Sequence, residues 1–213
     1  MSLKKRLLTS LILLSIVYLI INFSFFLLFA LLVFGVLSLI EYFSIIQKIF
    51  KNRFLKMFHN LIFTIFIFIF CFLFFFLSSI GQLKLIIFIL LFGCIASDIG
   101  GFIFGKIFKG PKLTKISPQK TISGAFGSIF FSVIIINMFF YYLTDTFKIN
   151  LIIISVITSI GCQLGDLFFS YLKRKAKIKD TGNILPGHGG VLDRLDGIFL
   201  GLPVGFIFFI LLF

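Results

Sequence analysis

Long apolar runs, separated by short basic segments, dominate the hydropathy pattern of this 213-residue chain. Membrane-spanning strands would be short and alternating, whereas these runs are long and continuous, so their length favours helices. A spanning helix needs about 20 mostly apolar residues. The pattern predicts an all-α polytopic integral membrane protein. We expect about seven spanning helices, over 7–21, 22–40, 61–77, 83–97, 122–143, 151–171 and 197–213.

Composition supports this class, since 60% of the residues are hydrophobic and 35 are Phe. A soluble domain of this size could not bury so much apolar surface. The N-terminal residues 1–21 have the basic start and apolar core of a signal peptide. They lack a small-x-small cleavage site and continue into further apolar sequence, so we expect a retained first span. Cys71, Cys94 and Cys162 lie singly in apolar runs and indicate neither a disulfide nor a zinc site.

The net charge of +13 follows the predicted topology. With the N-terminus in the cytoplasm, 18 of the 20 Lys and Arg residues fall in the cytoplasmic segments 1–6, 41–60, 98–121 and 172–196. This satisfies the positive-inside rule, and contact with anionic membrane lipids accounts for the basic excess without nucleic acid. No repeat or linker divides residues 1–213, so we expect a single transmembrane domain with a cytoplasmic N-terminus. The Phe, Ile and Lys bias is compatible with an AT-rich genome and favours a bacterial source. For this multi-pass protein we therefore expect the bacterial inner membrane.

Acidic residues are scarce, and their placement is informative. Five of the seven lie in or near the last two predicted cytoplasmic segments, whereas Glu41 follows the second span and fits an interfacial anchor. Asp166 stands inside a predicted span, about seven residues from Lys173 and Arg174, or roughly 10 Å deep. A carboxylate there costs at least ~2.5 kcal/mol, so it should face a cavity, a cation or a partner. Metal or substrate binding is favoured, and a structural ion pair with Lys or Arg is the alternative.

Asp193 and Asp196 are three residues apart at the predicted start of the last span, so they would share one helical face. Two carboxylates that close repel one another unless a cation or a proton lies between them, and a divalent metal is the usual remedy. All-oxygen ligands without nearby Cys favour Mg²⁺, whose coordination shell is completed by water and substrate phosphates. The alternative is a helix cap, since acids favour the first turn.

Two segments have groups suited to anions. The sequence PGHGG, with His188, Gly189 and Gly190, can fold its backbone N–H groups around a phosphate. The sequence SPQKT offers Ser117 and Lys120 at the membrane edge. By contrast, GGFIFGKI has P-loop spacing but Ile107 where Ser or Thr is required, so we reject a P-loop. Gly101 and Gly105 suit close helix contact instead.

The stretch SYLKRKAKIKDTGNILPGHGGVLDRLDG, residues 170–197, closely resembles the signature of phosphatidate cytidylyltransferases (CDP-diacylglycerol synthases). Asp98, Gly165 and Asp166 also fit that family, as do FGK and SP-x-KT. The resemblance covers roughly 94–213, whereas residues 1–90 agree only in hydropathy. The family commonly has Lys at the position of Gln119 and Glu at that of Ser123.

This resemblance implies transfer of CMP from CTP to phosphatidate, with release of pyrophosphate and a requirement for Mg²⁺. It implies that Asp166, Asp193 and Asp196 form the metal-binding core of a polar cavity open to the cytosol. Phosphatidate would enter from the inner leaflet. We expect Arg194 and Lys179 to act in catalysis beside the three aspartates. For substrate binding we expect two helix-end basic residues and the two anion-suited segments: Lys173, Arg174, Lys120, Ser117, His188, Gly189 and Gly190.

Two other functions remain as alternatives. A CTP-dependent lipid-alcohol kinase would transfer the γ-phosphoryl group instead of CMP. A cation channel or transporter could use Asp166 as an ion site, but it would not need the PGHGG segment. A homodimer, a monovalent ion beside Mg²⁺, and the roles of Asp98 and Asp180 are left open.

Overall fold

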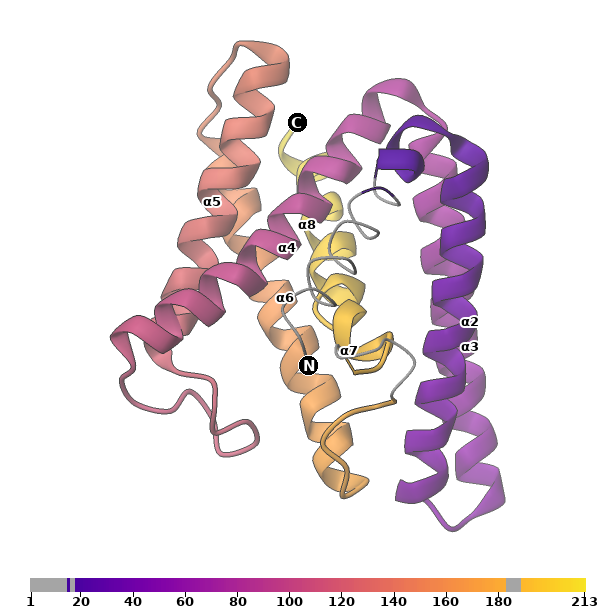
Figure 1. Cartoon of the computed structure of the whole chain (residues 1–213). Coiled ribbons are helices and arrows are strands. Elements are labelled where there is room, and N and C mark those ends of the chain that lie inside the picture. The colour runs from indigo at the N-terminus through magenta and orange to yellow at the C-terminus, as the bar shows by residue number, and fades with distance from the viewer. Residues whose placement is uncertain (1–14, 16–17, 183–188) are drawn as a thin grey trace. The chain divides into compact units, whose positions relative to one another are not determined.

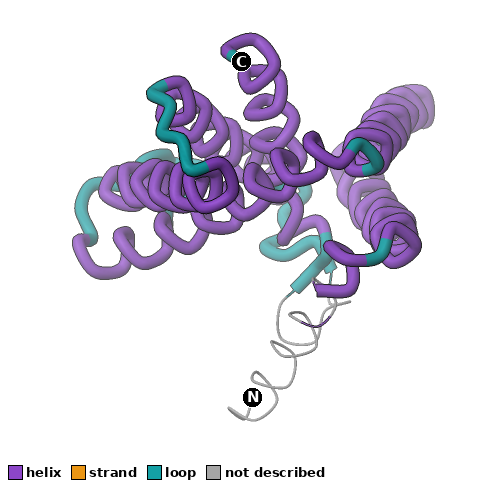
Figure 2. Tube along the Cα trace, turned by 90° about the horizontal axis from the view of Figure 1, so that it is seen from above, coloured by secondary structure: helices purple, strands orange, loops and turns teal. Residues whose placement is uncertain are grey.

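The computed structural model of the chain describes residue 15 and residues 18–182 and 189–213. Within these ranges the elements are helices joined by loops, with an isolated β-bridge between Lys112 and Thr121 (Figures 1 and 2). The all-α prediction is confirmed. The helices are α2 (Ser24–Ile49), α3 (Arg53–Ser78), α4 (Gly81–Phe108), α5 (Ile122–Thr144), α6 (Asn150–Lys175), α7 (Leu192–Leu195) and α8 (Ile198–Leu212).

Six helical segments in the described part of the chain are long and apolar enough to cross a membrane. They are α2 to α6 and the segment Leu192–Leu212, which contains α7 and α8. Each matches one of the predicted spans, and the chain is a multi-pass membrane protein. The first predicted span, 7–21, falls mainly outside the described residues.

The helices extend beyond the predicted spans. Most of the predicted cytoplasmic segment 41–60 is helical, because α2 continues to Ile49 and α3 begins at Arg53. Likewise, α4 runs to Phe108, so Asp98 and the GGFIFGK sequence lie in a helix that extends beyond the predicted span 83–97. Hydropathy detects where apolar residues end, whereas a helix continues until its backbone pairing is interrupted. Rejection of the P-loop is confirmed, since this segment is helical.

The chain forms two compact units. The first comprises residues 1–79 and 178–193, and the second comprises 80–177 and 194–213. The single-domain expectation stays a prediction. In the first unit α2 and α3 lie side by side as a helical pair (Figure 1). Tyr42 of α2 stacks on Phe63 of α3 with ring centroids 3.8 Å apart, a contact that packs the two helices together.

Close glycine contacts hold the second unit together. A Cβ atom on Gly124 of α5 would lie 2.9 Å from the carbonyl oxygen of Gly101 in α4, so both helices need glycine to approach this closely. Gly105 also faces Gly124, and the predicted role of Gly101 and Gly105 in helix contact is confirmed. Helix α4 also contacts α6, where the hydroxyl groups of Ser97 and Ser159 are hydrogen-bonded at 2.8 Å.

Helix α8 packs against α6 through a second glycine contact. A Cβ atom on Gly161 would lie 2.9 Å from the Cα atom of Gly201. This close approach brings the turn before α8 against the middle of α6, where Gly165 faces the backbone of Asp196. Glycine packing therefore brings Asp196 close to Asp166, the residue that follows Gly165.

Candidate functional site

Three carboxylates from separate helical segments gather in the second unit. Asp98 belongs to α4, Asp166 to α6, and Asp196 to the turn between α7 and α8. They are near enough that each interacts electrostatically with the other two. Asp196 is only 6% exposed. Since like charges repel strongly away from bulk water, cations or protons must compensate the charge of this group.

Lysine ammonium groups supply part of that compensation. The Nζ atom of Lys120 lies 2.5 Å from Oδ2 of Asp166, and the Nζ atom of Lys173 lies 3.7 Å from Oδ2 of Asp196. Arg194 is near enough to Asp98 to stabilise its charge. The ion-pair alternative for Asp166 is therefore observed. It does not exclude ligand binding, because an ammonium group has three donors.

The loop between α4 and α5 positions Lys120. The N–H of Leu113 donates to the Lys120 carbonyl oxygen at 2.8 Å, and the Lys120 N–H donates to that of Ser117 at 3.0 Å. Thr121 then caps α5 by accepting a hydrogen bond from the N–H of Gly124 at 3.1 Å. Ser123, where the family commonly has Glu, donates to the Lys109 carbonyl oxygen and closes the loop. Ser117 thus contributes to the shape of the loop, and its predicted substrate contact stays a prediction.

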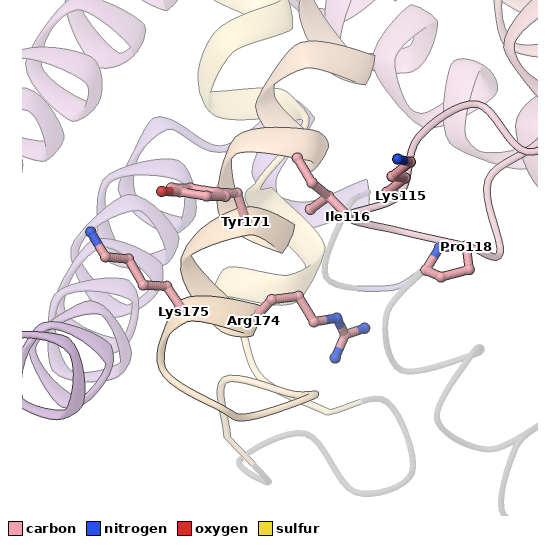
Figure 3. Close-up of a pocket in the computed structure, with 6 residues that line it drawn as sticks. All are labelled: Lys115, Ile116, Pro118, Tyr171, Arg174 and Lys175. Atoms are coloured by element: carbon pink, nitrogen blue, oxygen red, sulfur yellow. The ribbon is translucent and has the colours of Figure 1, made fainter.

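The same loop and the end of α6 form a basic pocket of about 460 Å³. Figure 3 shows Arg174 and Tyr171 projecting from α6 beside the loop that carries Lys115 and Ile116. Successive residues of a helix point about 100° apart. Arg174 therefore lines the pocket while its neighbour Lys173 reaches Asp196. The complete lining is Lys115, Ile116, Pro118, Tyr171, Arg174 and Lys175.

Asp193 lies in the first unit, where its Oδ2 atom organises the glycine segment before α7. It accepts hydrogen bonds from the N–H groups of Thr181 at 2.8 Å and Gly190 at 3.2 Å. Both donors precede α7, so these hydrogen bonds do not test the helix-cap alternative for Asp193. Gly189 has a φ of +82°, which a residue with a side chain rarely adopts. His188 lies outside the described residues.

The other predicted basic residues are exposed. Arg194 follows Asp193 in α7, and Lys179 lies in the segment that precedes Thr181. Their contacts to substrate stay predictions, as does any role for Asp180. Glu41, expected to be an interfacial anchor, is instead buried in the first unit and binds the segment before α7. An isolated acid in an apolar run was the one feature that could have pointed to this.

The described residues contain no group of three His, Cys, Asp or Glu side chains that could hold a metal ion. Asp98, Asp166 and Asp196 nevertheless match Mg²⁺ in chemistry, since they are hard oxygen ligands whose charges need a cation. In this arrangement Lys120 forms an ion pair with Asp166, and Lys173 forms one with Asp196. The predicted trio of Asp166, Asp193 and Asp196 stays a prediction as a set.

These features define the class of protein: an all-α, multi-pass membrane protein whose second unit carries carboxylates paired with ammonium groups, beside a basic pocket. The chain belongs to the Cytidylyltransferase family, whose sequence model matches residues 3–212.

Individual relatives carry a more specific name. The chain is 47% identical over 135 residues to a phosphatidate cytidylyltransferase of Rickettsia felis, which covers 58% of this chain and 59% of the relative. A phosphatidate cytidylyltransferase of Synechocystis is 38% identical over 130 residues, an alignment that covers 60% of this chain and 44% of the relative. A phosphatidate cytidylyltransferase of Staphylococcus aureus is 41% identical over 110 residues, an alignment that covers 51% of this chain and 42% of the relative. Each alignment spans less than two thirds of the relative's own length.

Proposed function

We propose that this chain transfers CMP from CTP to phosphatidate, giving CDP-diacylglycerol and pyrophosphate. Family membership and the names of the relatives support this reaction class. The observation that carries the proposal is the group of Asp98, Asp166 and Asp196 with their lysine partners inside the second unit. Carboxylates and cations gathered at one place are what a site for two phosphate-bearing substrates requires.

The reaction joins two polyanions. A phosphate oxygen of phosphatidate attacks the α-phosphorus of CTP, the bond from that phosphorus to the bridging oxygen of the β-phosphate breaks, and pyrophosphate leaves. The nucleophile is already an anion, so the reaction needs no strong general base. Positioning and neutralisation of charge supply most of the rate in transfers of this kind.

Lys120 is well suited to bind a phosphate. Its Nζ atom is withdrawn from solvent and has no aligned hydrogen-bond acceptor among the described residues, although it lies in ionic contact with Asp166. An ammonium group held in this way retains donors for a phosphate oxygen. Lys173, which is 9% exposed, is held near Asp196 in a similar ionic contact.

The basic pocket provides a second place for negative charge. Arg174, Lys115 and Lys175 offer cationic donors, and the ring of Tyr171 and the side chain of Ile116 form apolar walls. An arginine fork binds phosphate oxygens in pairs. We assign this pocket to the phosphates of the nucleotide, which agrees with the substrate binding predicted for Arg174.

Mg²⁺ is the proposed cofactor, and Asp166 and Asp196 would hold it in the second unit. When bound, the ion would neutralise phosphate charge. Asp193 remains the third proposed ligand. Its Oδ2 atom accepts hydrogen bonds from the N–H groups of Thr181 and Gly190 within the first unit.

The proposed location is the bacterial inner membrane, with the N-terminus and the site on the cytoplasmic side. The distribution of Lys and Arg supports this orientation. Lys115 and Arg174, which line the basic pocket, both lie in or beside segments expected in the cytoplasm. CTP would then arrive from the cytosol, and phosphatidate from the inner leaflet.

Radiolabelled CTP tests the function directly. Purified protein in detergent is incubated with phosphatidate, Mg²⁺ and CTP labelled at either the α- or the γ-phosphate. Cytidylyl transfer places the α-label in lipid and the γ-label in pyrophosphate. Entry of the γ-label into a lipid alcohol would instead identify a lipid kinase. Cation flux in vesicles without any CTP turnover would favour a channel or transporter.

A further inference from the structure

Glu41 is a buried carboxylate in the N-terminal part of the chain. It belongs to α2, it is the only acidic residue of that helix, and it is 3% exposed. A charge withdrawn from solvent is costly unless hydrogen bonds and partners compensate it. The partners of Glu41 therefore explain why the chain retains an acid at this position.

All three described partners come from the segment that carries the glycine motif. The N–H of Val191 donates to Oε1 at 3.0 Å, and the N–H of Leu192 donates to Oε2 at 2.9 Å. The hydroxyl of Thr181 donates to Oε2 at 2.5 Å. One carboxylate thus holds both ends of the segment between Thr181 and Leu192.

Thr181 links Glu41 to Asp193. Its oxygen lies 2.5 Å from Oε2 of Glu41 and 3.0 Å from Oδ2 of Asp193, but a hydroxyl has only one proton to donate. The shorter distance assigns that proton to Glu41. Asp193 is then held by the N–H groups of Thr181 and Gly190. Any displacement of Glu41 therefore moves the backbone that orients Asp193.

Two glycines complete this arrangement. A Cβ atom on Gly182 would lie 2.8 Å from Oε1 of Glu41, and one on Gly190 would collide with the hydroxyl of Thr181. Both positions therefore exclude larger residues because Glu41 and Thr181 occupy the space. The glycines serve the packing around Glu41 in addition to any contact with an anion.

We propose that Glu41 is a positioning residue, which fixes Asp193 and the backbone from Gly190 to Leu192 through Thr181 and the N–H groups of Val191 and Leu192. It acts through these groups and does not contact substrate. The consequence for activity rests on the proposed CMP transfer. The N-terminal part of the chain, which we expected to agree with the family only in hydropathy, is covered by the family's sequence model. Through Glu41 it contributes to the conformation of the site.

Hydrogen exchange on the full-length protein tests the positioning without reference to activity. In Glu41→Gln the new NH₂ group opposes backbone donors, so we expect peptides covering 189–195 to exchange about tenfold faster or more. The matched control is Ser38→Ala, one turn earlier in α2. Ser38 is fully buried, and its hydroxyl has no hydrogen-bond partner among the described residues. We expect wild-type exchange in this control.

Thr181 provides a matched pair that does not disturb α2. Thr181→Val removes the hydroxyl at nearly constant shape, whereas Thr181→Ser keeps it. We expect rapid exchange at 189–195 in the Val variant and restored protection in the Ser variant. Should Glu41→Gln fail to fold, this pair tests the same connection. Equal exchange in Thr181→Val and Thr181→Ser, or wild-type exchange in a folded Glu41→Gln protein, would overturn the proposal.

Kinetics of CMP transfer give the second measurement. Glu41→Gln and Thr181→Val should each lower kcat by about tenfold or more, with a smaller change in the KM for CTP. The double variant should be no slower than the slower single variant, because both act through one connection. Additive losses would contradict a shared path. If wild-type protein transfers no CMP but the exchange results hold, the proposed function fails and the positioning role stands.

Discussion

The Lys120–Asp166 ion pair allows stability and activity to be separated by charge alone. Lys120→Met removes the ammonium group and leaves Asp166 beside two further carboxylates, Asp98 and Asp196. Lys120→Met/Asp166→Asn removes both charges and keeps similar side-chain volumes. We expect the single variant to lose stability and activity, and the double variant to recover stability only.

The magnitude follows from distance and exposure. Unit charges ~4 Å apart attract by about 4 kcal/mol at an effective dielectric of ~20. The two side chains are 23% and 34% exposed, so water screens part of this attraction. We expect Lys120→Met to lower the free energy of unfolding by about 1–3 kcal/mol. For a chain of this size, that corresponds to a fall in Tm of roughly 2–10 °C.

Thermal unfolding in detergent and CMP transfer from labelled CTP are the two assays. Lys84→Met, near the start of α4, is the control for loss of one lysine charge and should change neither. In the double variant Tm should return to within about 2 °C of wild type. Its kcat/KM should stay at least tenfold below wild type, which corresponds to a loss of roughly 1.4 kcal/mol of transition-state stabilisation. A double variant as unstable as Lys120→Met would refute the charge argument, and a fully active Lys120→Met would refute its catalytic part.

Three further predictions concern other parts of the chain. Asp193→Asn keeps a carbonyl oxygen for the loop N–H groups, so the protein should fold normally but transfer CMP about 100-fold more slowly or worse; near-normal turnover would refute the metal assignment. Gly124→Ala should lower the free energy of unfolding by about 1–3 kcal/mol, measured by thermal unfolding, because its Cβ would meet the Gly101 carbonyl oxygen at 2.9 Å. Gly81→Ala, where a Cβ meets nothing within 4 Å, is the control. Arg174→Gln should raise the KM for CTP about tenfold, and an unchanged KM would remove the basic pocket from nucleotide binding.

The helices and the acids of interest were predictable from sequence for a local reason. Apolar runs long enough to span a bilayer leave few alternatives to helix, because backbone groups in lipid must be paired within the segment. The predicted spans accordingly match α2 to α6 and the final segment. Asp166 was recognisable because a carboxylate in such a run is costly. Helix ends were less predictable, since α4 continues through Asp98 and the GGFIFGK sequence to Phe108.

Which groups meet was decided by the tertiary structure. The sequence by itself determined an all-α membrane protein, its scarce acids and its glycine motifs, because hydropathy and composition are local properties. It did not determine that Lys120 pairs with Asp166, or that Glu41 binds a segment 140 residues later. Those pairings depend on glycine-mediated helix contacts and on loop geometry, which bring residues together regardless of their separation along the chain. Burial increases the energetic importance of each pairing, because a charge removed from water is costly unless a partner in the fold compensates it.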